Sequence, residues 1–359
     1  MSKYPLILCF QFIFFGLLGQ QASNIDSSFQ NLVTKYENVG VSAAYAVNGE
    51  TKWTASKGYA NAALKTEFNE NTRTRIASIT KPFTAICIMQ LVEKGNLKLD
   101  DEIHEYIPDY PQKSESKITI RQLLTHTSGI DGYKNTKEAT TTTDYPTLEE
   151  ATKIFRDRKL KFEPGTEYLY TTYGYVVLGL IIEKVSGQTY EEYIQEHILD
   201  IVGMNNTGVE KYGKIYPGKS SIYHMEKGNV IAPEVNNLSN RIPAGGLYAT
   251  VVDLIKFGNA VMNNSLITEA SLNEMLKIGF PQEKDNPYGL GWFLYGPKES
   301  ENQFIGHGGG QFGANTQLML IPKLKATIVV LSNTSETPNS NIIRFSVEVL
   351  EKILIENKK

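Results

Sequence analysis

Apolar residues recur every three or four positions between residues 25 and 36. This spacing is typical of one face of a helix, and it predicts an amphipathic helix at residues 26–37. Residues 39–47 and 51–56 follow as two predicted strands, and they flank Asn48 and Gly49. Because these two residue types tolerate the positive φ angles of a tight hairpin, the two strands are predicted to pair.

The C-terminal part of the chain shows a second β-rich pattern. Residues 303–306, 315–321 and 326–332 are predicted strands, and the apolar positions of residues 342–354 predict a closing helix. Short connections make successive strands antiparallel neighbours. Between the two β-rich ends, glycine and proline breakers separate a series of helical patterns.

These patterns predict an α/β (α+β) fold in which an antiparallel sheet is flanked by helices. We expect the sheet domain to comprise approximately residues 25–90 and 240–359, with a mostly helical domain at approximately residues 91–239 inserted in it. Residues 131–146 are polar and poor in apolar side chains, which predicts a mobile surface loop. An inert loop is the favoured interpretation, and a lid over a site is the alternative.

The first 22 residues have the pattern of a secretory signal. A short positive start at Met1–Lys3 precedes an almost entirely apolar run to Gly19, and small or polar residues follow. The run is shorter than the ~20 residues of a membrane-spanning helix and has no stop-transfer charges behind it. We therefore expect residues 1–22 to direct export to the periplasm or the extracellular space, and residues 23–359 to form the mature module. An uncleaved membrane anchor is the alternative.

The composition excludes several classes of protein. The chain has 359 residues, of which 41% are hydrophobic and 21% charged, as in packed globular proteins. The net charge of −3 provides no basic surface for nucleic acid. Five scattered histidines and a single cysteine after residue 22, Cys87, match no metal-binding pattern, so no metal or organic cofactor is expected. No heptad pattern indicates an oligomer.

One segment combines a nucleophile with a base. Ser78 and Lys81 lie one helical turn apart, and the residues after Pro82 are apolar on nearly every face, as in a buried helix. Burial lowers the pKa of a lysine, so Lys81 could take the proton of the Ser78 hydroxyl. The helix start also offers backbone N–H groups to an oxyanion. The same Ser-x-x-Lys spacing recurs at Ser114, but there it lies in a polar turn.

Ser78-Ile79-Thr80-Lys81 resembles the first motif of the serine β-lactamase and penicillin-binding protein superfamily. The segments 97–101, 118–129, 243–247 and 288–292 resemble its class C-like branch, which includes esterases, D-amino-acid peptidases and LACTB-type proteins. The resemblance runs from about residue 29 to residue 349. It implies a β-lactamase/transpeptidase-like fold and catalysis through an acyl-serine intermediate.

The resemblance also assigns the second motif. Residues 164–172 match its frame and place Tyr170 beside the serine and lysine, where a phenol next to an ammonium group would lose or relay a proton more readily than a free tyrosine. A packing role is the alternative for Tyr170. The family commonly has asparagine where this chain has Thr172, which weakens a contact to substrate amides. Thr172 is therefore expected to line the substrate.

The third motif is a strand-borne cation followed by glycines. Residues 306–310 fit it, with His307 in place of lysine, and Gly309 and Gly310 are expected to border the substrate, the N–H of Gly310 facing the oxyanion. A histidine with a pKa of ~6.5 carries only part of a charge at neutral pH, so it would hold a substrate carboxylate less firmly than lysine. This also argues against a specialist β-lactamase.

The resulting prediction is an exported serine hydrolase acting on an ester, a D-amino-acid peptide or a lactam. Ser78, Lys81 and Tyr170 would be catalytic, and Thr172, His307, Gly309 and Gly310 would bind the substrate, a small molecule or a peptide. An esterase or D-peptidase is favoured over a β-lactamase, although the sequence does not separate these activities. A non-catalytic sensor or scaffold with the same shape is the alternative.

Overall fold

The computed structural model describes residues 25–35, 38–112, 115, 117–282, 287–296, 303–337 and 339–357. The predicted export signal lies outside these residues. Within the described part of the chain, every helix is too short or too polar to cross a membrane.

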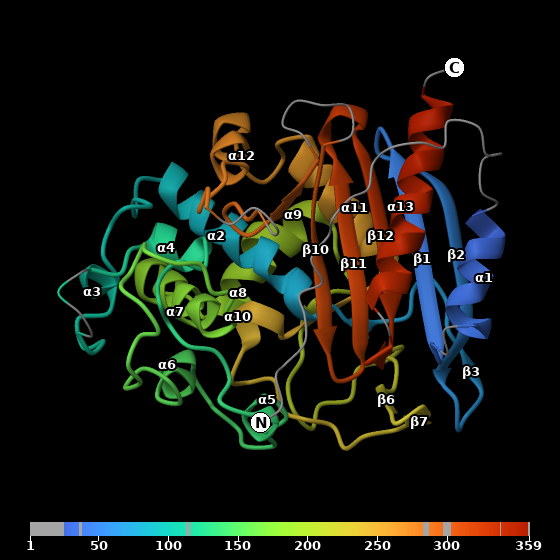
Figure 1. Cartoon of the computed structure of the whole chain (residues 1–359), viewed down its shortest axis with the longest axis horizontal. Coiled ribbons are helices and arrows are strands. Elements are labelled where there is room, and N and C mark those ends of the chain that lie inside the picture. The colour runs from blue at the N-terminus through green and yellow to red at the C-terminus, as the bar shows by residue number, and fades with distance from the viewer. Residues whose placement is uncertain are drawn as a thin grey trace.

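A seven-stranded sheet forms one half of the molecule (Figure 1). Its strand order is β3-β2-β1-β12-β11-β10-β9, and every neighbouring pair is antiparallel, as predicted. Its strands are β1 (Gly40–Val47), β2 (Glu50–Asn61), β3 (Thr66–Glu67), β9 (Phe293–Tyr295), β10 (Phe304–Gln311), β11 (Ala314–Ile321) and β12 (Ala326–Ser332). Segments from both ends of the chain therefore build the one sheet.

Helices cover both faces of this sheet because its central strands are apolar on both sides. In β1, Val41 and Ala43 face the helices α1 (Ile25–Thr34) and α13 (Asn339–Glu356), whereas Ala44 and Ala46 face the opposite core. The same alternation runs through β11 and β12. Helix α11 (Val251–Met262) packs on the second face, between the sheet and the helical half of the molecule.

The other half is mostly helical. Helix α2 (Thr80–Glu93) runs through its centre and is buried along nearly its whole length. Around it lie α3 (Ile103–Tyr106), α4 (Ile120–Leu124), α5 (Thr136–Ala139), α6 (Leu148–Thr152), α7 (Tyr173–Ser186), α8 (Tyr190–Ile194), α9 (Asp200–Val202), α10 (Ile242–Gly245) and α12 (Glu269–Met275). Three helical segments of the described chain are not α-helical: η1 (Ala77–Ile79) and η3 (Pro322–Leu324) are 3₁₀ turns, and η2 (Gln195–Leu199) is a π-helix.

Two small sheets supplement the helical half. One has the order β13-β6-β7 and the other β4-β8-β5. Their strands are β4 (Thr74–Arg75), β5 (Gly208–Val209), β6 (Tyr223–Glu226), β7 (Asn229–Ile231), β8 (Leu247–Ala249) and β13 (Thr334–Ser335). Three of these strands, β5 to β7, lie in the region whose sequence pattern predicts mostly helices.

Several predicted elements are present in the structure, but they begin or end at other residues than predicted. The hairpin is confirmed, with φ angles of 52° at Asn48 and 81° at Gly49 between β1 and β2. The predicted strand at residues 303–306 extends through the glycine run to Gln311, because these glycines pair with β11. Residues 131–146 contain α5 and are hydrogen-bonded to a neighbouring segment, residues 236–241. This segment is thus anchored, in contrast to the predicted free loop.

Candidate active site

The backbone before helix α2 presents Ser78 at the junction of the two halves. Ser78 lies in η1, and the preceding residue, Ala77, has a φ of 49°, a left-handed conformation that is unfavourable for alanine. On either side of Ile76 the chain is fixed, because Ile76 N–H donates to Leu247 O at 3.0 Å and Thr316 Oγ1 donates to Ile76 O at 3.1 Å. The strained turn is therefore held by β8 and β11.

Lys81 is one turn further along and is fully buried. Its Nζ lies 2.9 Å from Ser78 Oγ and donates to Ala244 O at 3.0 Å. Burial and, to a smaller extent, the positive charge of Arg241 together lower the pKa of Lys81 to about 7. Because half of the lysine is then uncharged near neutrality, its lone pair is available to accept the Ser78 proton.

The carbonyl of Ala244 is placed by the packing of α10 against α2 and α7. Thr84 Oγ1 donates to Pro243 O at 2.6 Å. On the other side, a Cβ at Gly179 of α7 would lie 2.1 Å from Pro243 Cγ, so only glycine allows this close approach. These two contacts hold Ala244 O where it orients the Lys81 amine.

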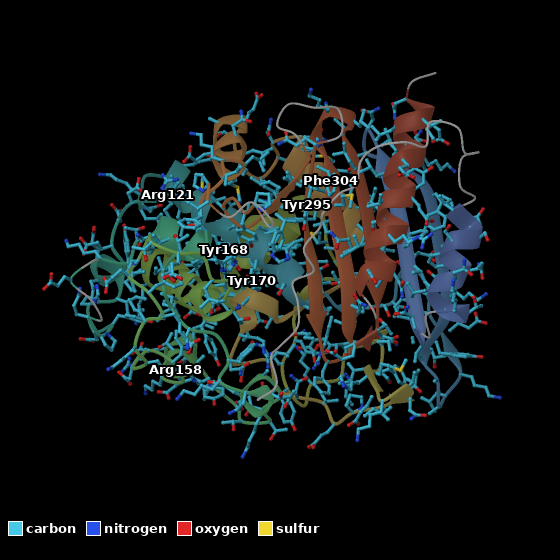
Figure 2. The ribbon with its side chains drawn as sticks, in the orientation of Figure 1. Arg121, Arg158, Tyr168, Tyr170, Tyr295 and Phe304 are labelled. Carbon is cyan, nitrogen blue, oxygen red and sulfur yellow. The ribbon has the colours of Figure 1, made fainter. Side chains whose placement is uncertain are left out.

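Tyr170 completes the group, as the spacing of the motifs predicts. Its hydroxyl shares a hydrogen bond with Ser78, and Lys81 Nζ lies 4.9 Å from the centre of its ring. Figure 2 shows Tyr170 on the helical side of strand β10. Burial raises the pKa of Tyr170, and the hydrogen bond from Ser78 opposes this effect only in part. The expectation that this phenol loses its proton more readily than a free tyrosine is therefore wrong for the unliganded site, where Lys81 is the group that is partly unprotonated at neutral pH.

His307 lies on β10 with its ring buried beside Tyr170, at 6.1 Å between ring centres. Its Nδ1–H donates to Gly308 O at 2.7 Å, and Tyr288 Oη donates to its Nε2 at 3.1 Å. Burial and the nearby Lys81 lower the pKa of His307 to about 3. The predicted partial charge is therefore wrong, because this histidine is neutral at pH 7.

The glycines of β10 lie along an open edge next to Ser78. Strand β9 pairs with residues 304–306, and among the described residues no strand pairs with His307 to Gln311 on that side. A Cβ at Gly309 would meet Ile76 O and Thr316 Oγ1, both at 2.3 Å, whereas a Cβ at Gly310 would meet nothing within 4 Å. Gly309 thus allows β10 to approach the Ser78 turn, and Gly310 faces open space.

Replacing Gly309 with alanine should lower the free energy of unfolding by about 2–3 kcal/mol, because the new methyl group overlaps the backbone of the Ser78 turn. Gly310→Ala is the matched control and should change it by less than about 1 kcal/mol. Denaturant titration of both variants measures the difference. Equal stability of the two would show that the turn yields to the methyl group without cost.

Thr172 is half-buried at the residue before α7, and its hydroxyl does not cap that helix. Its neighbour Thr171 has the structural contacts: its N–H donates to His126 Nδ1 at 3.2 Å, and its hydroxyl donates to Asp131 O at 3.1 Å. Thr171 therefore fixes the chain, which leaves the Thr172 hydroxyl available for a ligand.

His126 lies in the segment 118–129, which resembles the family's loop bordering the site, whereas sequence reasoning missed the side chains of Tyr288 and Arg241. The His126 ring lies 4.4 Å from that of Tyr170 and 4.7 Å from that of Tyr288, and the residue has a φ of 59°. Burial and the nearby Lys81 and His307 lower the pKa of His126. The ring is therefore neutral, and it packs against the ring of Tyr170. Tyr288 lies in the segment 288–292, and Arg241 lies two residues before the segment 243–247. Their place in or beside segments that resemble the family is the only signal for them in the sequence.

Residues 25–349 match the family described as Beta-lactamase. The chain belongs to this family. It is 31% identical over 277 residues to the putative penicillin-binding protein PbpX of Bacillus subtilis, with 77% of this chain and 67% of that protein covered.

Two solved structures of this kind share the fold. The octameric penicillin-binding protein homologue from Pyrococcus abyssi matches with a TM-score of 0.81 and 29% identity, over 93% of this chain and 78% of that one. D-amino acid amidase from Ochrobactrum anthropi SV3 matches with a TM-score of 0.77 and 26% identity, over 91% and 99% of the two chains. The resemblance of the motifs to this superfamily and the predicted fold class are confirmed.

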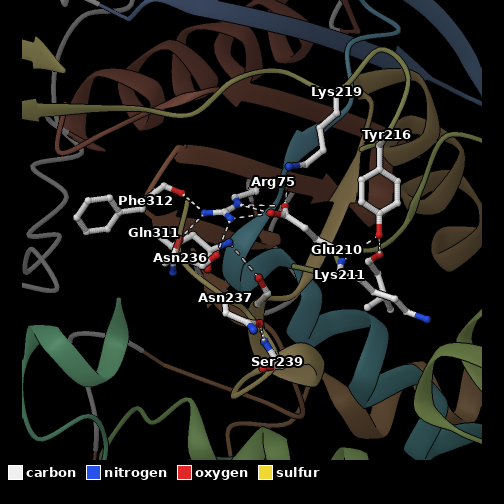
Figure 3. Close-up of polar contacts among 12 residues, drawn as sticks. Arg75, Glu210, Lys211, Tyr216, Lys219, Asn236, Asn237, Ser239, Gln311 and Phe312 are labelled. Atoms are coloured by element: carbon white, nitrogen blue, oxygen red, sulfur yellow. Dashed lines mark hydrogen bonds and ion pairs between the residues drawn. The ribbon is translucent and has the colours of Figure 1, made fainter. Parts of the chain in front are cut away.

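A buried ion-pair cluster in this Beta-lactamase family member holds both sides of the site (Figure 3). Arg75, three residues before Ser78, pairs with Glu210 at 2.6 Å and also donates to Asn236 Oδ1 at 2.7 Å and Phe312 O at 2.8 Å. Lys219 contacts the other oxygen of Glu210 at 3.0 Å. Burial acts to raise the pKa of Glu210, but Arg75 and Lys219 outweigh it and lower the pKa. The guanidinium of Arg75 thus links the segment before Ser78 to the β10–β11 turn, and Glu210 neutralises its charge.

Glu210→Leu should lower the free energy of unfolding by about 3–5 kcal/mol, because it leaves the buried cations Arg75 and Lys219 without an acid. The double variant Arg75→Met/Glu210→Leu should lose less than the sum of the single variants. Glu149→Leu breaks the exposed pair with Lys184 and should cost under about 1 kcal/mol. Additive losses in the double variant would contradict this account.

Proposed function

We propose that this chain is a serine hydrolase that forms an acyl-enzyme on Ser78. Membership of the Beta-lactamase family supports a hydrolase of this class. The observation that carries the assignment is the 2.9 Å separation of Ser78 Oγ from a buried lysine amine whose pKa is about 7. A hydroxyl paired with a neutral amine at this distance has the geometry of an activated nucleophile.

In the first step, Ser78 Oγ attacks the substrate carbonyl and its proton passes to Lys81 Nζ. The tetrahedral oxyanion is stabilised by the N–H groups of Ser78 and Gly310, and Gly310 faces open space on β10. The proton then passes from Lys81 through the Tyr170 hydroxyl to the leaving group, which departs as the ester or amide bond breaks. Tyr170 acts as a protonated relay, in agreement with its raised pKa.

In the second step, water attacks the acyl-serine carbonyl. Neutral Lys81 takes the water proton, and the acid product leaves as Ser78 regains a proton. The neutral histidines His307 and His126 supply shape and orientation to this cycle without adding charge. Thr172 and the β10 glycines line the substrate.

We propose an ester or a D-amino-acid amide or peptide as the substrate class, in preference to a β-lactam. Thr172 lacks the carboxamide found at this place in the family, and His307 has no charge with which to hold a lactam carboxylate in the manner of lysine. The match to a protein named D-amino acid amidase supports the same class.

The test compares a p-nitrophenyl ester, a peptide ending in D-Ala-D-Ala and nitrocefin on the purified protein. We expect the ester or the D-peptide to have the highest kcat/KM, with the Ser78→Ala protein as the blank. A strong preference for nitrocefin would contradict the substrate class. Absence of turnover on all three would favour the non-catalytic alternative.

We also propose that the protein is exported, on the basis of the N-terminal pattern alone. Fractionation of the cells that produce it, with determination of the N-terminus of the recovered protein, tests this proposal. A mature N-terminus near residue 23 is expected, whereas an intact Met1 would indicate that the segment is retained.

A further inference from the structure

Arg241 is a buried cation directly before helix α10, in which the carbonyl of Ala244 contacts Lys81. Its side chain belongs to a residue that is only 5% exposed. The N–H groups of Ala244 and Gly245 donate to Arg241 O at 2.9 and 3.0 Å, so Arg241 begins the turn whose carbonyl at Ala244 accepts a hydrogen bond from Lys81. The turn that Arg241 begins is thus bonded to Lys81, and the positive charge of Arg241 is close enough to contribute to the lowered pKa of Lys81.

The guanidinium of Arg241 has only uncharged partners. Nε donates to Asn240 Oδ1 at 2.9 Å, Nη2 donates to Ala139 O, and the group lies 5.1 Å from the centre of the Tyr133 ring. Its third nitrogen, Nη1, has no acceptor among the described residues and is not sealed from solvent.

The acids of the adjacent segment are already engaged. Glu138 pairs with Arg158, and Asp131 pairs with Lys161 at 3.1 Å. Among the residues that the structure describes, none therefore supplies Arg241 with a carboxylate partner.

An unpaired buried charge is costly, and such costs are concentrated at binding and catalytic sites. The other titratable groups of the site supply no negative charge to balance Arg241. His307 and His126 are neutral, and Lys81 is either neutral or positive. Tyr133, on which Arg241 packs, has a buried hydroxyl without a hydrogen-bond partner. Arg241 Nη1 and the Tyr133 hydroxyl are thus two donors on neighbouring side chains, and neither has an acceptor among the described residues.

We propose that Arg241, with the Tyr133 hydroxyl, forms the anion subsite of this cleft, and that the preferred substrates carry a carboxylate near the scissile carbonyl. The cation that holds the substrate is then Arg241, directly before α10. The neutral His307 on β10 contributes no charge. This inference rests on the proposed hydrolase function and specifies its substrate class.

The test uses two matched esters, mono-p-nitrophenyl glutarate and its methyl ester, which differ only in the free carboxylate. The quantity measured is the ratio of their kcat/KM values at about pH 9, where Lys81 is uncharged, after subtraction of the Ser78→Ala blank. We expect wild-type protein to favour the acid by about 10- to 100-fold, as for a charged hydrogen bond. Arg241→Gln should reduce the ratio to about 1, mainly through the KM of the acid.

Two further variants separate this role from a structural one. Arg241→Lys keeps the charge and should retain part of the preference, whereas Arg158→Gln, in the neighbouring ion pair, should keep the wild-type ratio. A structural defect would lower both esters equally and leave the ratio unchanged. A ratio near 1 in the wild type, or one that Arg241→Gln does not alter, would overturn the proposal.

A binding measurement separates the subsite from the catalytic proposal. Calorimetry of glutarate with Ser78→Ala protein should show binding that is at least 10-fold weaker in Ser78→Ala/Arg241→Gln. If neither ester is hydrolysed through Ser78 but glutarate binds through Arg241, the hydrolase function fails and the subsite stands. If the esters are hydrolysed through Ser78 but glutarate binding does not depend on Arg241, the hydrolase function stands and the subsite is overturned.

Discussion

Ser78→Ala should lower kcat for a p-nitrophenyl ester by about 10⁴-fold or more, because it removes the oxygen that forms the acyl bond. The substitution deletes one half-buried hydroxyl next to Lys81, so the folded structure should persist. Steady-state kinetics and a thermal melt on the same preparation check both statements.

The chain contains its own control for this substitution. Ser114 and Lys117 have the same spacing as Ser78 and Lys81, so Ser114→Ala is matched in chemistry and in motif. It should leave kcat within about twofold of wild type, because the sequence assigns Ser114 to a polar turn without a catalytic role. Comparable activity of Ser78→Ala and Ser114→Ala proteins would contradict the assignment of the nucleophile.

Lys81→Met should lower kcat by about 10³-fold and at the same time stabilise the protein. General-base removal accounts for the loss of activity. The stability change has two opposing contributions: shifting the Lys81 pKa from 10.5 to about 7 costs about 5 kcal/mol at neutral pH, and leaving Ser78 Oγ and Ala244 O without their partner costs about 1–3 kcal/mol. The first contribution is larger, so we expect a net gain of about 2 kcal/mol in the free energy of unfolding.

The pH dependence follows from the same shift. Between pH 7 and 10.5 the unfolded chain keeps the Lys81 proton that the folded protein has lost, so this residue makes stability rise with pH in that window. The neutral amine is the active form, so kcat/KM should rise with pH through about 7 and level off above it.

Lys94→Met, at the exposed end of the same helix, is the matched control and should change neither quantity appreciably. A Lys81→Met protein that is less stable than wild type, or a wild-type rate that falls as pH rises through 7, would contradict the role of Lys81 as the base.

The sheet could be predicted because each of its central strands is a local apolar run with a turn signal beside it. Asn48-Gly49 and the runs of β11 and β12 contain that information within a few residues. The extension of β10 through its glycines could not, because glycine has no strand preference of its own and the extension depends on the pairing of these residues with β11. The short strands β5 to β7 likewise depend on partners far along the chain.

The identity of the site residues was more predictable than their protonation states. Ser78, Lys81 and Tyr170 could be brought together by their spacing and by the resemblance, and the structure places them in contact. The neutral state of His307 and the raised pKa of Tyr170 depend on burial by several elements at once, which no short motif encodes. Arg241 was missed for the same reason, since its importance comes from the acid partner that it lacks.

The central claim is that Ser78 becomes covalently acylated, and intact-protein mass spectrometry tests it most directly. After treatment with a fluorophosphonate probe, which reacts with an activated serine by loss of HF, the wild-type protein should gain the mass of one probe less HF, and proteolysis should place it on the peptide that contains Ser78. The Ser78→Ala protein should gain none. Labelling of another residue, or equal labelling of both proteins, would contradict the account.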